Sequence, residues 1–301
     1  MSDSHVVLRG VTKEFDGVAA VKEVDLVLEA GQCVALAGHN GAGKSTMIKM
    51  MLGLLRPTQG EVQVLGRDPM DSASDARRNV GYLPETVALY PSMTGIETLA
   101  WYAQLKRQSP AGNQALLERV GIAQAARRRV GGYSKGMRQR LALAQALLGE
   151  PQVLFMDEPT TGLDPASRQV FYEIVRELRD RGATILLCSH ALAELEGQAD
   201  RIVVMKNGSK VADGTLGELR LQADMPVVIR VALSQPLRDA TALPAQWQVT
   251  GPFMLECRCR PQDKVAVLQQ VWTLGGEIAD IDVAQPGLDE MYAHFLRREE
   301  A

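Results

Sequence analysis

The residues best suited to chemistry form a glycine-rich run that ends in a lysine and two hydroxyl side chains. It matches the pattern G-x-x-x-x-G-K-[ST] and reads Gly38-His39-Asn40-Gly41-Ala42-Gly43-Lys44-Ser45-Thr46. Glycines let a backbone curl so that successive N–H groups point toward an anion. Lys44 can place its ammonium on the outer phosphates of a nucleotide, and the Ser45 hydroxyl can ligate Mg²⁺. We therefore expect these residues to contact phosphate: Gly38, Asn40, Gly41, Ala42, Gly43, Lys44, Ser45 and Thr46.

A second group with chemical potential follows a short apolar run, Val153-Leu154-Phe155-Met156. Asp157 and Glu158 come directly after it, at the expected end of a strand. Beside a phosphate loop, Asp157 can hold Mg²⁺ through its water shell. Glu158 can take the proton of an attacking water. Acids at strand ends are also often merely solvated, but the pairing with the glycine-rich run favours a phosphate-loop nucleotidase.

Short strands that alternate with helices must position both groups. Gln32–Ala37 predicts a buried strand before the glycine run, and Lys44–Leu55 has apolar residues at helical spacing. A helix that begins near Gly43 directs its positive dipole end at the phosphates. Further strands are predicted at 61–65, 80–83, 153–156, 184–188 and 201–205. This alternation is typical of an α/β fold with a mostly parallel sheet covered on both faces.

Two stretches depart from the alternation. From about 86 to 150 the patterns are helical, which predicts a helical subdomain inside a first domain of residues 1–222. Later, Val227, Ile229, Val231 and Leu233 alternate with less apolar neighbours, as a half-buried strand does. Other strand patterns and a final apolar helix stripe follow. Residues 223–301 are therefore predicted to form a small α+β domain with a regulatory or interaction role.

Three further motifs resemble those of one family, the ABC ATPases. The run 133–140, Tyr-Ser-Lys-Gly-Met-Arg-Gln-Arg, precedes a long helical pattern and resembles the ABC signature, normally L-S-G-G-Q. Gly162-Leu163-Asp164 resembles the ABC D-loop. His190, just past the strand at 184–188, matches the ABC switch histidine; a lone histidine is more often structural, but its order after the acidic strand favours function. Residues from about 5 to 222 resemble an ABC ATPase domain throughout, which implies a phosphate-loop NTPase with a mixed sheet.

The resemblance implies a role for individual residues. Glu158 and His190 are the expected catalytic residues. Phe15 matches the aromatic side chain that stacks on adenine, and the alternative is a buried core aromatic. The remaining nucleotide contacts are expected from Ser134, Lys135, Gly136, Met137 and Asp164. The expected Mg²⁺ ligands are Ser45, Glu85 and Asp157, and the expected cofactors are ATP and Mg²⁺.

Two motifs depart from the family pattern. Lys135 and Met137 replace glycine and glutamine in the signature, whereas Ser134 and Gly136, which allow close approach to phosphate, are kept. We expect Lys135 to add positive charge near the phosphates. Glu85 stands where many members have glutamine, and its carboxylate is expected to contact Mg²⁺ or its water. This substitution resembles a subgroup that serves two-component exporters.

The resemblance also implies partners. In a head-to-tail homodimer, the signature of one chain would cap ATP on the phosphate loop of the other. Because no apolar run reaches the roughly 18 residues needed to span a bilayer, a separate membrane permease is expected. The implied location is the cytoplasmic face of the inner membrane, with an accessory or periplasmic binding subunit as a further partner. The Glu85 variant and the trailing domain resemble ATPases of copper-site maturation transporters for nitrous oxide reductase, which implies a copper or sulfur cargo.

Composition and motif order argue against several other classes. The hydrophobic fraction of 46% indicates a packed core, and the net charge of −3 gives no basic field for nucleic acid. The four scattered cysteines favour a reducing compartment. Cys257 and Cys259 could bind Cu(I) as thiolates, but they share a strand face with Leu255, which favours burial. A phosphotransferase kinase would leave the signature and His190 unexplained.

Non-transport ABC ATPases are the remaining alternative. Those of DNA maintenance insert long coiled coils between the phosphate loop and the acidic strand, and the sequence has no heptad run there. Translation-associated members carry two ATPase domains in one chain, whereas this sequence has one. A transporter subunit is therefore the favoured interpretation.

Overall fold

The computed structural model describes residues 4–71, 75–190, 192–235, 243–272 and 277–298. The chain divides into two compact units, Met1–Asp213 and Gly214–Ala301. This division comes earlier in the chain than the expected boundary after residue 222. The reason is helix α6 (Leu216–Ala223), which packs with helix α8 (Leu288–Arg298) of the second unit. Arg220 Nε also donates a hydrogen bond to the Pro286 carbonyl at 3.3 Å.

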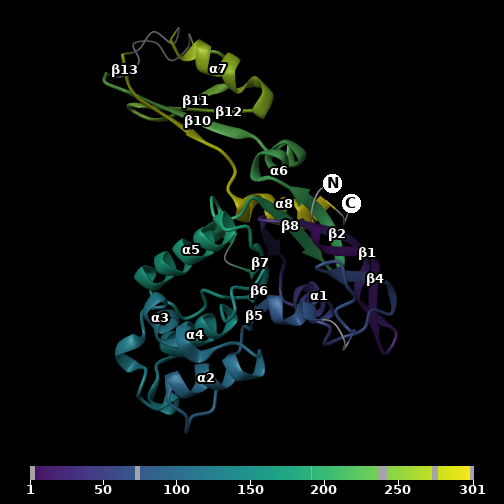
Figure 1. Ribbon diagram of the computed structural model, residues 1–301. Helices are drawn as coiled ribbons and strands as arrows, with labels where there is room; N and C mark the ends of the chain where they lie inside the picture. The colour runs from purple at the N-terminus through teal and green to yellow at the C-terminus, as the bar shows by residue number, and fades with distance from the viewer. Residues whose placement is uncertain (1–3, 72–74, 191, 236–242, 273–276, 299–301) are drawn as a thin grey trace. The chain divides into compact units, whose positions relative to one another are not determined.

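The centre of the first unit is a six-stranded sheet (Figure 1). In spatial order its strands are β5 (Val80–Leu83), β6 (Val153–Asp157), β7 (Thr184–Ser189), β3 (Cys33–Ala37), β8 (Arg201–Lys206) and β9 (Ser209–Gly214). The neighbours from β5 to β8 pair in parallel. Only Asn207 and Gly208, both with positive φ, join β8 to β9 as a hairpin. Every residue of β3, β6 and β7 is buried, as a sheet covered on both faces requires.

A second, antiparallel sheet lies at the N-terminal end of this unit and was not predicted as a sheet. It consists of β2 (Val18–Glu29), β1 (Ser4–Phe15) and β4 (Gln59–Val64), in that order. Register shifts interrupt the pairing of β1 with β2, so the simple alternation of apolar residues is broken. Its inner residues Val6, Leu8 and Val11 join one hydrophobic core with β3 and helix α1 (Lys44–Met51).

The helices between β5 and β6 form a group of their own (Figure 1). They are α2 (Gly95–Leu105), α3 (Asn113–Arg119) and α4 (Lys135–Ala146), within the range where a helical subdomain was predicted. A capping box of Thr94 and Glu97 begins α2. Helix α5 (Pro165–Asp180) follows β6 and starts after its N-cap Asp164. Among the described residues, no helix has both the length and the apolar composition to cross a membrane.

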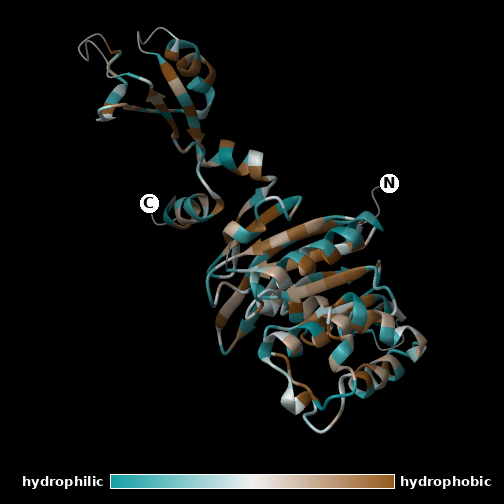
Figure 2. Cartoon of the chain, turned by 90° about the vertical axis from the view of Figure 1, so that its left-hand side faces the viewer, coloured by the Kyte–Doolittle hydropathy of each residue, from teal (hydrophilic) through white to brown (hydrophobic). Residues whose placement is uncertain are grey.

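The second unit contains a four-stranded antiparallel sheet. Its order is β11 (Trp247–Gly251), β12 (Met254–Cys259), β10 (Val227–Leu233) and β13 (Ile278–Ala284). Helix α7 (Lys264–Val271) contributes Val267 and Val271 to the same core as the predicted alternating residues of β10. Cys257 is buried in this core, as its position beside Leu255 predicted. Figure 2 shows the hydrophobic strands of both units against their more hydrophilic loops.

Short 3₁₀ turns connect several of these elements. They lie at Asp75–Asn79, Pro110–Gly112, Ala123–Ala125, Val130–Gly132, Leu192–Leu195 and Pro261–Asp263.

Candidate active site

The glycine-rich loop connects the end of β3 to the start of α1 and turns back on itself. Ala42 donates its backbone N–H to the His39 carbonyl at 3.1 Å, which closes the turn. Gly43 has a φ of 102°, and a Cβ there would lie 2.5 Å from the carbonyl oxygen of Ala20. Only glycine fits this position, because an L side chain would be both strained and in collision with backbone.

Lys44 is buried, and its ammonium is held by the backbone of the same loop. Its Nζ donates to the carbonyl oxygens of Gly38 and, at 3.2 Å, of His39. Three sources of positive potential therefore meet at the loop: its N–H groups, the N-terminal end of α1 and the Lys44 ammonium. That combination is suited to binding a polyphosphate.

Ser45 and Asp157 join the two groups that the sequence singled out. Ser45 Oγ donates a hydrogen bond to Asp157 Oδ2 at 2.8 Å. They meet because β3 and β6 run in parallel with only β7 between them, so their carboxyl ends share one edge of the sheet. A hydroxyl and a carboxylate beside bound phosphates are the oxygen donors that Mg²⁺ prefers. Glu85, which follows the end of β5, lines the same cleft.

The electrostatics of this edge are negative. Burial, and after it the neighbouring Asp157, Cys188 and Glu85, together raise the pKa of Tyr82 to about 12. Burial likewise raises the pKa of the Cys188 thiol, with Asp157 contributing. Burial is the main cause of both shifts, and the Asp157 carboxylate contributes to each of them.

Glu158 and His190 form the other close pair. Nδ1 of His190 lies 2.7 Å from Oε2 of Glu158. The Glu158 side chain is only 8% exposed, whereas that of His190 is 65% exposed. Glu158 has a φ of 49°, a left-handed conformation that costs free energy for any residue with a Cβ. Such strain at an acid beside a phosphate loop is typical of a residue held in position for chemistry.

Most of the predicted contacts line a single cleft of about 500 Å³. It brings together Phe15, Asn40, Gly41, Ala42, Gly43, Lys44, Ser45, Thr46, Glu85, Asp157 and Glu158, with Ala20 in addition. Phe15 is 46% exposed and has Lys13 Nζ 5.1 Å from its ring centre. The alternative of a buried core aromatic is therefore wrong for Phe15.

The signature and D-loop residues do not line this cleft of their own chain; they contact each other. Ser134 caps α4 by accepting a hydrogen bond from the Met137 N–H at 3.2 Å. The Lys135 stem packs across Gly162, where an added Cβ would lie 2.8 Å from Lys135 Cδ. The carbonyl of Gly162 also faces Gly136. The Lys135 charge therefore lies outside the cleft of its own chain.

Asp164 is a helix cap in this structure. Its carboxylate accepts hydrogen bonds from the Ser167 N–H at 2.9 Å and the Ser167 hydroxyl at 2.8 Å. These two bonds lower the pKa of Asp164. A contact to nucleotide within the same chain does not follow from this position.

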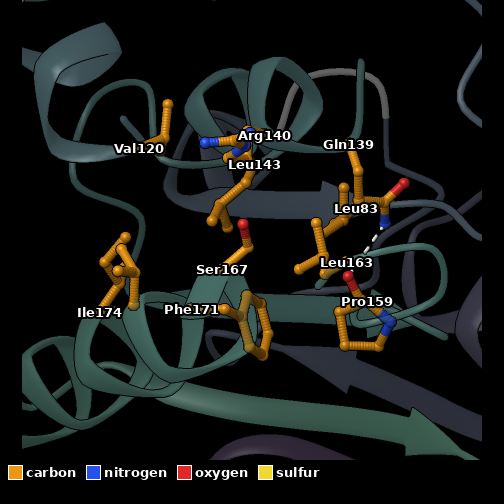
Figure 3. A pocket seen from close by; sticks show the side chains of 11 residues that line it. Leu83, Val120, Gln139, Arg140, Leu143, Pro159, Leu163, Ser167, Phe171 and Ile174 are labelled. Atoms are coloured by element: carbon orange, nitrogen blue, oxygen red, sulfur yellow. Dashed lines mark hydrogen bonds between the residues drawn. The ribbon is translucent and has the colours of Figure 1, made fainter. Parts of the chain in front are cut away.

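Sequence analysis missed the residues that support the loop after Glu158. Gln139 Nε2 donates to the Pro159 carbonyl at 3.1 Å, in a buried hydrogen bond drawn in Figure 3. Thr160 Oγ1 donates to Glu194 Oε2 at 3.2 Å, and Arg168 pairs with the other oxygen of Glu194. Gln139 belongs to the signature-like run 133–140 but was given no role there, and Thr160, Arg168 and Glu194 each lie within a few residues of a motif.

The comparisons with known proteins agree with this geometry. A sequence model of the family described as ABC transporter matches residues 21–161. The daunorubicin resistance ATP-binding protein DrrA3 of Streptomyces coeruleorubidus is 34% identical over 98% of this chain and 96% of its own length. The chain belongs to the ATP-binding proteins of ABC transporters. The ABC ATPase is also 40% identical to Nod factor export ATP-binding protein I of Burkholderia lata, over 68% of this chain and 69% of that protein.

A solved structure supports the same fold for this ABC ATPase. It is described as the ATP binding subunit of an ABC transporter and superposes with a TM-score of 0.68 at 34% identity, covering 72% of this chain and 92% of its own. The phosphate-loop α/β fold with a mixed sheet, the binding of ATP and the ATPase activity of an ABC transporter follow from family membership. Membership also implies a permease as partner.

Proposed function

We propose that Glu158 is the general base of ATP hydrolysis in this ABC ATPase and that His190 orients it. The observation that carries the proposal is the 2.7 Å contact between the two side chains at the phosphate-loop cleft. A carboxylate fixed at one oxygen by an imidazole can accept the proton of an attacking water at its other oxygen. Burial of Glu158 limits competing water, and the strained backbone fixes the direction of the carboxylate.

The remaining cleft residues would hold the triphosphate. Lys44 and the loop N–H groups bind the outer phosphates, and Phe15 stacks on the adenine. Ser45 and Asp157 would hold Mg²⁺, with Glu85 on the same side. The ion, when bound, neutralises charge that develops on the phosphates.

Equilibrium binding of ATP to the purified chain tests the assignment of these residues to the triphosphate. Lys44→Ala should weaken ATP binding at least about 10-fold, because it removes the buried cation of the loop. Lys49→Ala is the matched control: Lys49 lies on the same helix, is exposed and does not line the cleft. Equal ATP affinity for Lys44→Ala and Lys49→Ala would overturn the phosphate-loop assignment.

We further propose that two copies of the chain act together, with the signature of one covering ATP on the other. The supporting observation is that the capped N-terminal end of α4 does not line the cleft of its own chain. A helix N-terminus favours anions, so a partner's triphosphate is a suitable ligand. Glu158→Gln should accumulate as an ATP-bound dimer by light scattering, and Glu158→Gln with Ser134→Arg should remain monomeric. A monomer for Glu158→Gln at saturating ATP would overturn the proposed dimer.

We propose an export role through a separate permease, with this subunit at the cytoplasmic face of the membrane. The support is the naming of relatives for daunorubicin resistance and Nod factor export. These relatives give no support for the expected copper or sulfur cargo, and Cys257 is buried in a hydrophobic core. Purification of tagged Glu158→Gln from native membranes should recover one membrane-spanning subunit in a stoichiometric amount. Its absence would favour a non-transport ABC ATPase.

A further inference from the structure

The seam between the helical subdomain and the sheet-bearing core of the first unit is largely apolar. On the core side, α5 presents Ser167, Phe171 and Ile174, which recur at helical spacing on one face (Figure 3). Opposite them lie Val120 and Leu143 of the helical subdomain. Apolar surfaces of this kind hold two bodies together without fixing their relative position, because the attraction is non-directional.

Within the described part of the chain, directional contacts cross this seam at two places. Arg119 Nη2 lies 2.7 Å from Glu177 Oε2, which joins α3 to α5. Gln139 Nε2 donates to the Pro159 carbonyl, which joins α4 to the loop after β6. The first pair is part-exposed, whereas Gln139 is 5% exposed and its bond is buried. A buried hydrogen bond is costly to break without a replacement, so the Gln139 contact sets geometry more strictly.

Gln139 holds the carbonyl group of Pro159, the residue that follows the proposed base. Pro159 comes directly after Glu158, and its ring fixes its own φ. Glu158 itself is in the left-handed region, and its carbonyl accepts the Thr161 N–H at 3.2 Å. A strained residue keeps its conformation only where its surroundings impose it. Gln139 is therefore placed to maintain the conformation of Glu158 from outside the sheet.

Gln139 also lies on the same helix as the signature. Ser134 caps α4, and Gln139 lies in the second turn of that helix. Movement of the Ser134 end is transmitted to Gln139, since a helix of this length behaves as a rigid rod. One end of α4 thus lies outside the cleft of its own chain, while the next turn of the helix holds the Pro159 carbonyl.

We propose that Gln139 is a positioning residue for Glu158 and couples the two ATP sites of the dimer. This inference rests on the proposed function. When the Ser134 end of α4 covers ATP on the partner, the Gln139–Pro159 bond adjusts Glu158 at the other ATP site. Hydrolysis at one site then depends on occupancy of the other, which is positive cooperativity.

The test compares steady-state ATP hydrolysis by wild type, Gln139→Met and Glu177→Gln. Met keeps the length of Gln in an apolar crevice but has no N–H donor. Gln139→Met should lower kcat about 5- to 20-fold, leave KM for ATP within about 2-fold and reduce the Hill coefficient toward 1. Glu177→Gln removes the negative charge from the other polar contact of the seam and should keep wild-type kcat and Hill coefficient.

A third variant provides a pH readout. In Gln139→Glu the carboxylate cannot donate to the Pro159 carbonyl, but the protonated carboxyl can. Its kcat relative to wild type should therefore rise as the pH is lowered, whereas that of Gln139→Met should stay low at every pH. A role of Gln139 that does not depend on donation to the Pro159 carbonyl predicts no such recovery.

Three results would overturn the inference: wild-type kcat and Hill coefficient in Gln139→Met, a change in KM alone, or an equal loss in Glu177→Gln. If the wild-type chain does not hydrolyse ATP, that result would instead overturn the proposed function and this inference with it. The two failures are therefore distinguishable, because the second is seen before any variant is compared.

Discussion

His190 approaches Glu158 through Nδ1 at 2.7 Å. His190 comes just after β7, and β7 pairs with β6, the strand that ends directly before Glu158. The parallel pairing of β6 with β7 brings the two side chains to one edge of the sheet. His190→Ala should therefore lower kcat about 100-fold or more, because Glu158 loses the group that orients it, while ATP affinity is kept. Single-turnover hydrolysis and equilibrium binding measure the two quantities. Unchanged single-turnover rates would remove His190 from the mechanism.

The Ser45–Asp157 contact predicts a dependence on Mg²⁺. Ser45→Ala removes one proposed ligand and the hydrogen bond to Asp157 at 2.8 Å. The Mg²⁺ concentration for half-maximal turnover should rise about 10-fold or more, since second partners of ligating carboxylates typically matter by that amount. A Mg²⁺ titration of ATPase activity gives the value. Identical titration curves for Ser45→Ala and wild type would contradict the assignment.

The position of Phe15 at the cleft predicts that its ring contributes to ATP affinity by stacking on the adenine. Its ring is half exposed at the cleft, so Phe15→Ala should weaken ATP affinity about 10-fold, by loss of stacking. Phe15→Trp should retain affinity, because it keeps an aromatic face. Fluorescent-nucleotide titration compares the variants. If Phe15→Ala and Phe15→Trp have the same ATP affinity, the ring does not stack on the base.

The burial of Lys106 predicts that the free energy of unfolding depends on pH. Burial lowers its pKa from 10.5 to about 8, while its Nζ donates to the Leu148 carbonyl at 2.9 Å. Between these two pH values the folded state has lost a proton that the unfolded state retains, so the free energy of unfolding rises with pH. The cost of the buried charge is fully present below about pH 8 and relieved by about pH 10.5.

The measurement is urea unfolding of wild type and Lys106→Met across that range. The stability of wild type relative to Lys106→Met should increase by on the order of 1–3 kcal/mol from pH 8 to pH 10.5. Lys106→Met serves as the reference because it lacks the titrating group. A constant difference over the range would show that Lys106 titrates normally.

Much of the site was predictable because its chemistry is local in sequence. The turn of the glycine loop, its strand and its helix lie within about twenty residues. The positive φ of Gly43 belongs to that turn, whereas the carbonyl that excludes a side chain there is that of Ala20. Asp157 and Glu158 likewise follow directly from the end of one buried strand. The antiparallel β1–β2 pair was missed, because register shifts broke the alternation that would have marked it.

The signature motif places the Lys135 charge near phosphate without saying which chain holds that phosphate. In its own chain the Lys135 stem packs across Gly162, outside the cleft, so its place near phosphate stays a prediction for the proposed dimer. Thr160 and Glu194 gave no signal, and Gln139 was marked only as part of the run 133–140, since a buried amide and a hydrogen-bonded hydroxyl look ordinary in sequence. Their importance depends on which backbone group each one meets.

The sequence by itself determined the phosphate loop, the acidic strand end and the family, because glycine geometry and strand periodicity are properties of short segments. Only the tertiary structure decided that Ser45 meets Asp157, that His190 meets Glu158 and that Gln139 holds Pro159. These contacts join residues brought together by the order of strands in the sheet and by the packing of α4 against the loop after β6. That arrangement minimises exposed apolar surface over the whole unit, so it is not encoded in any one segment.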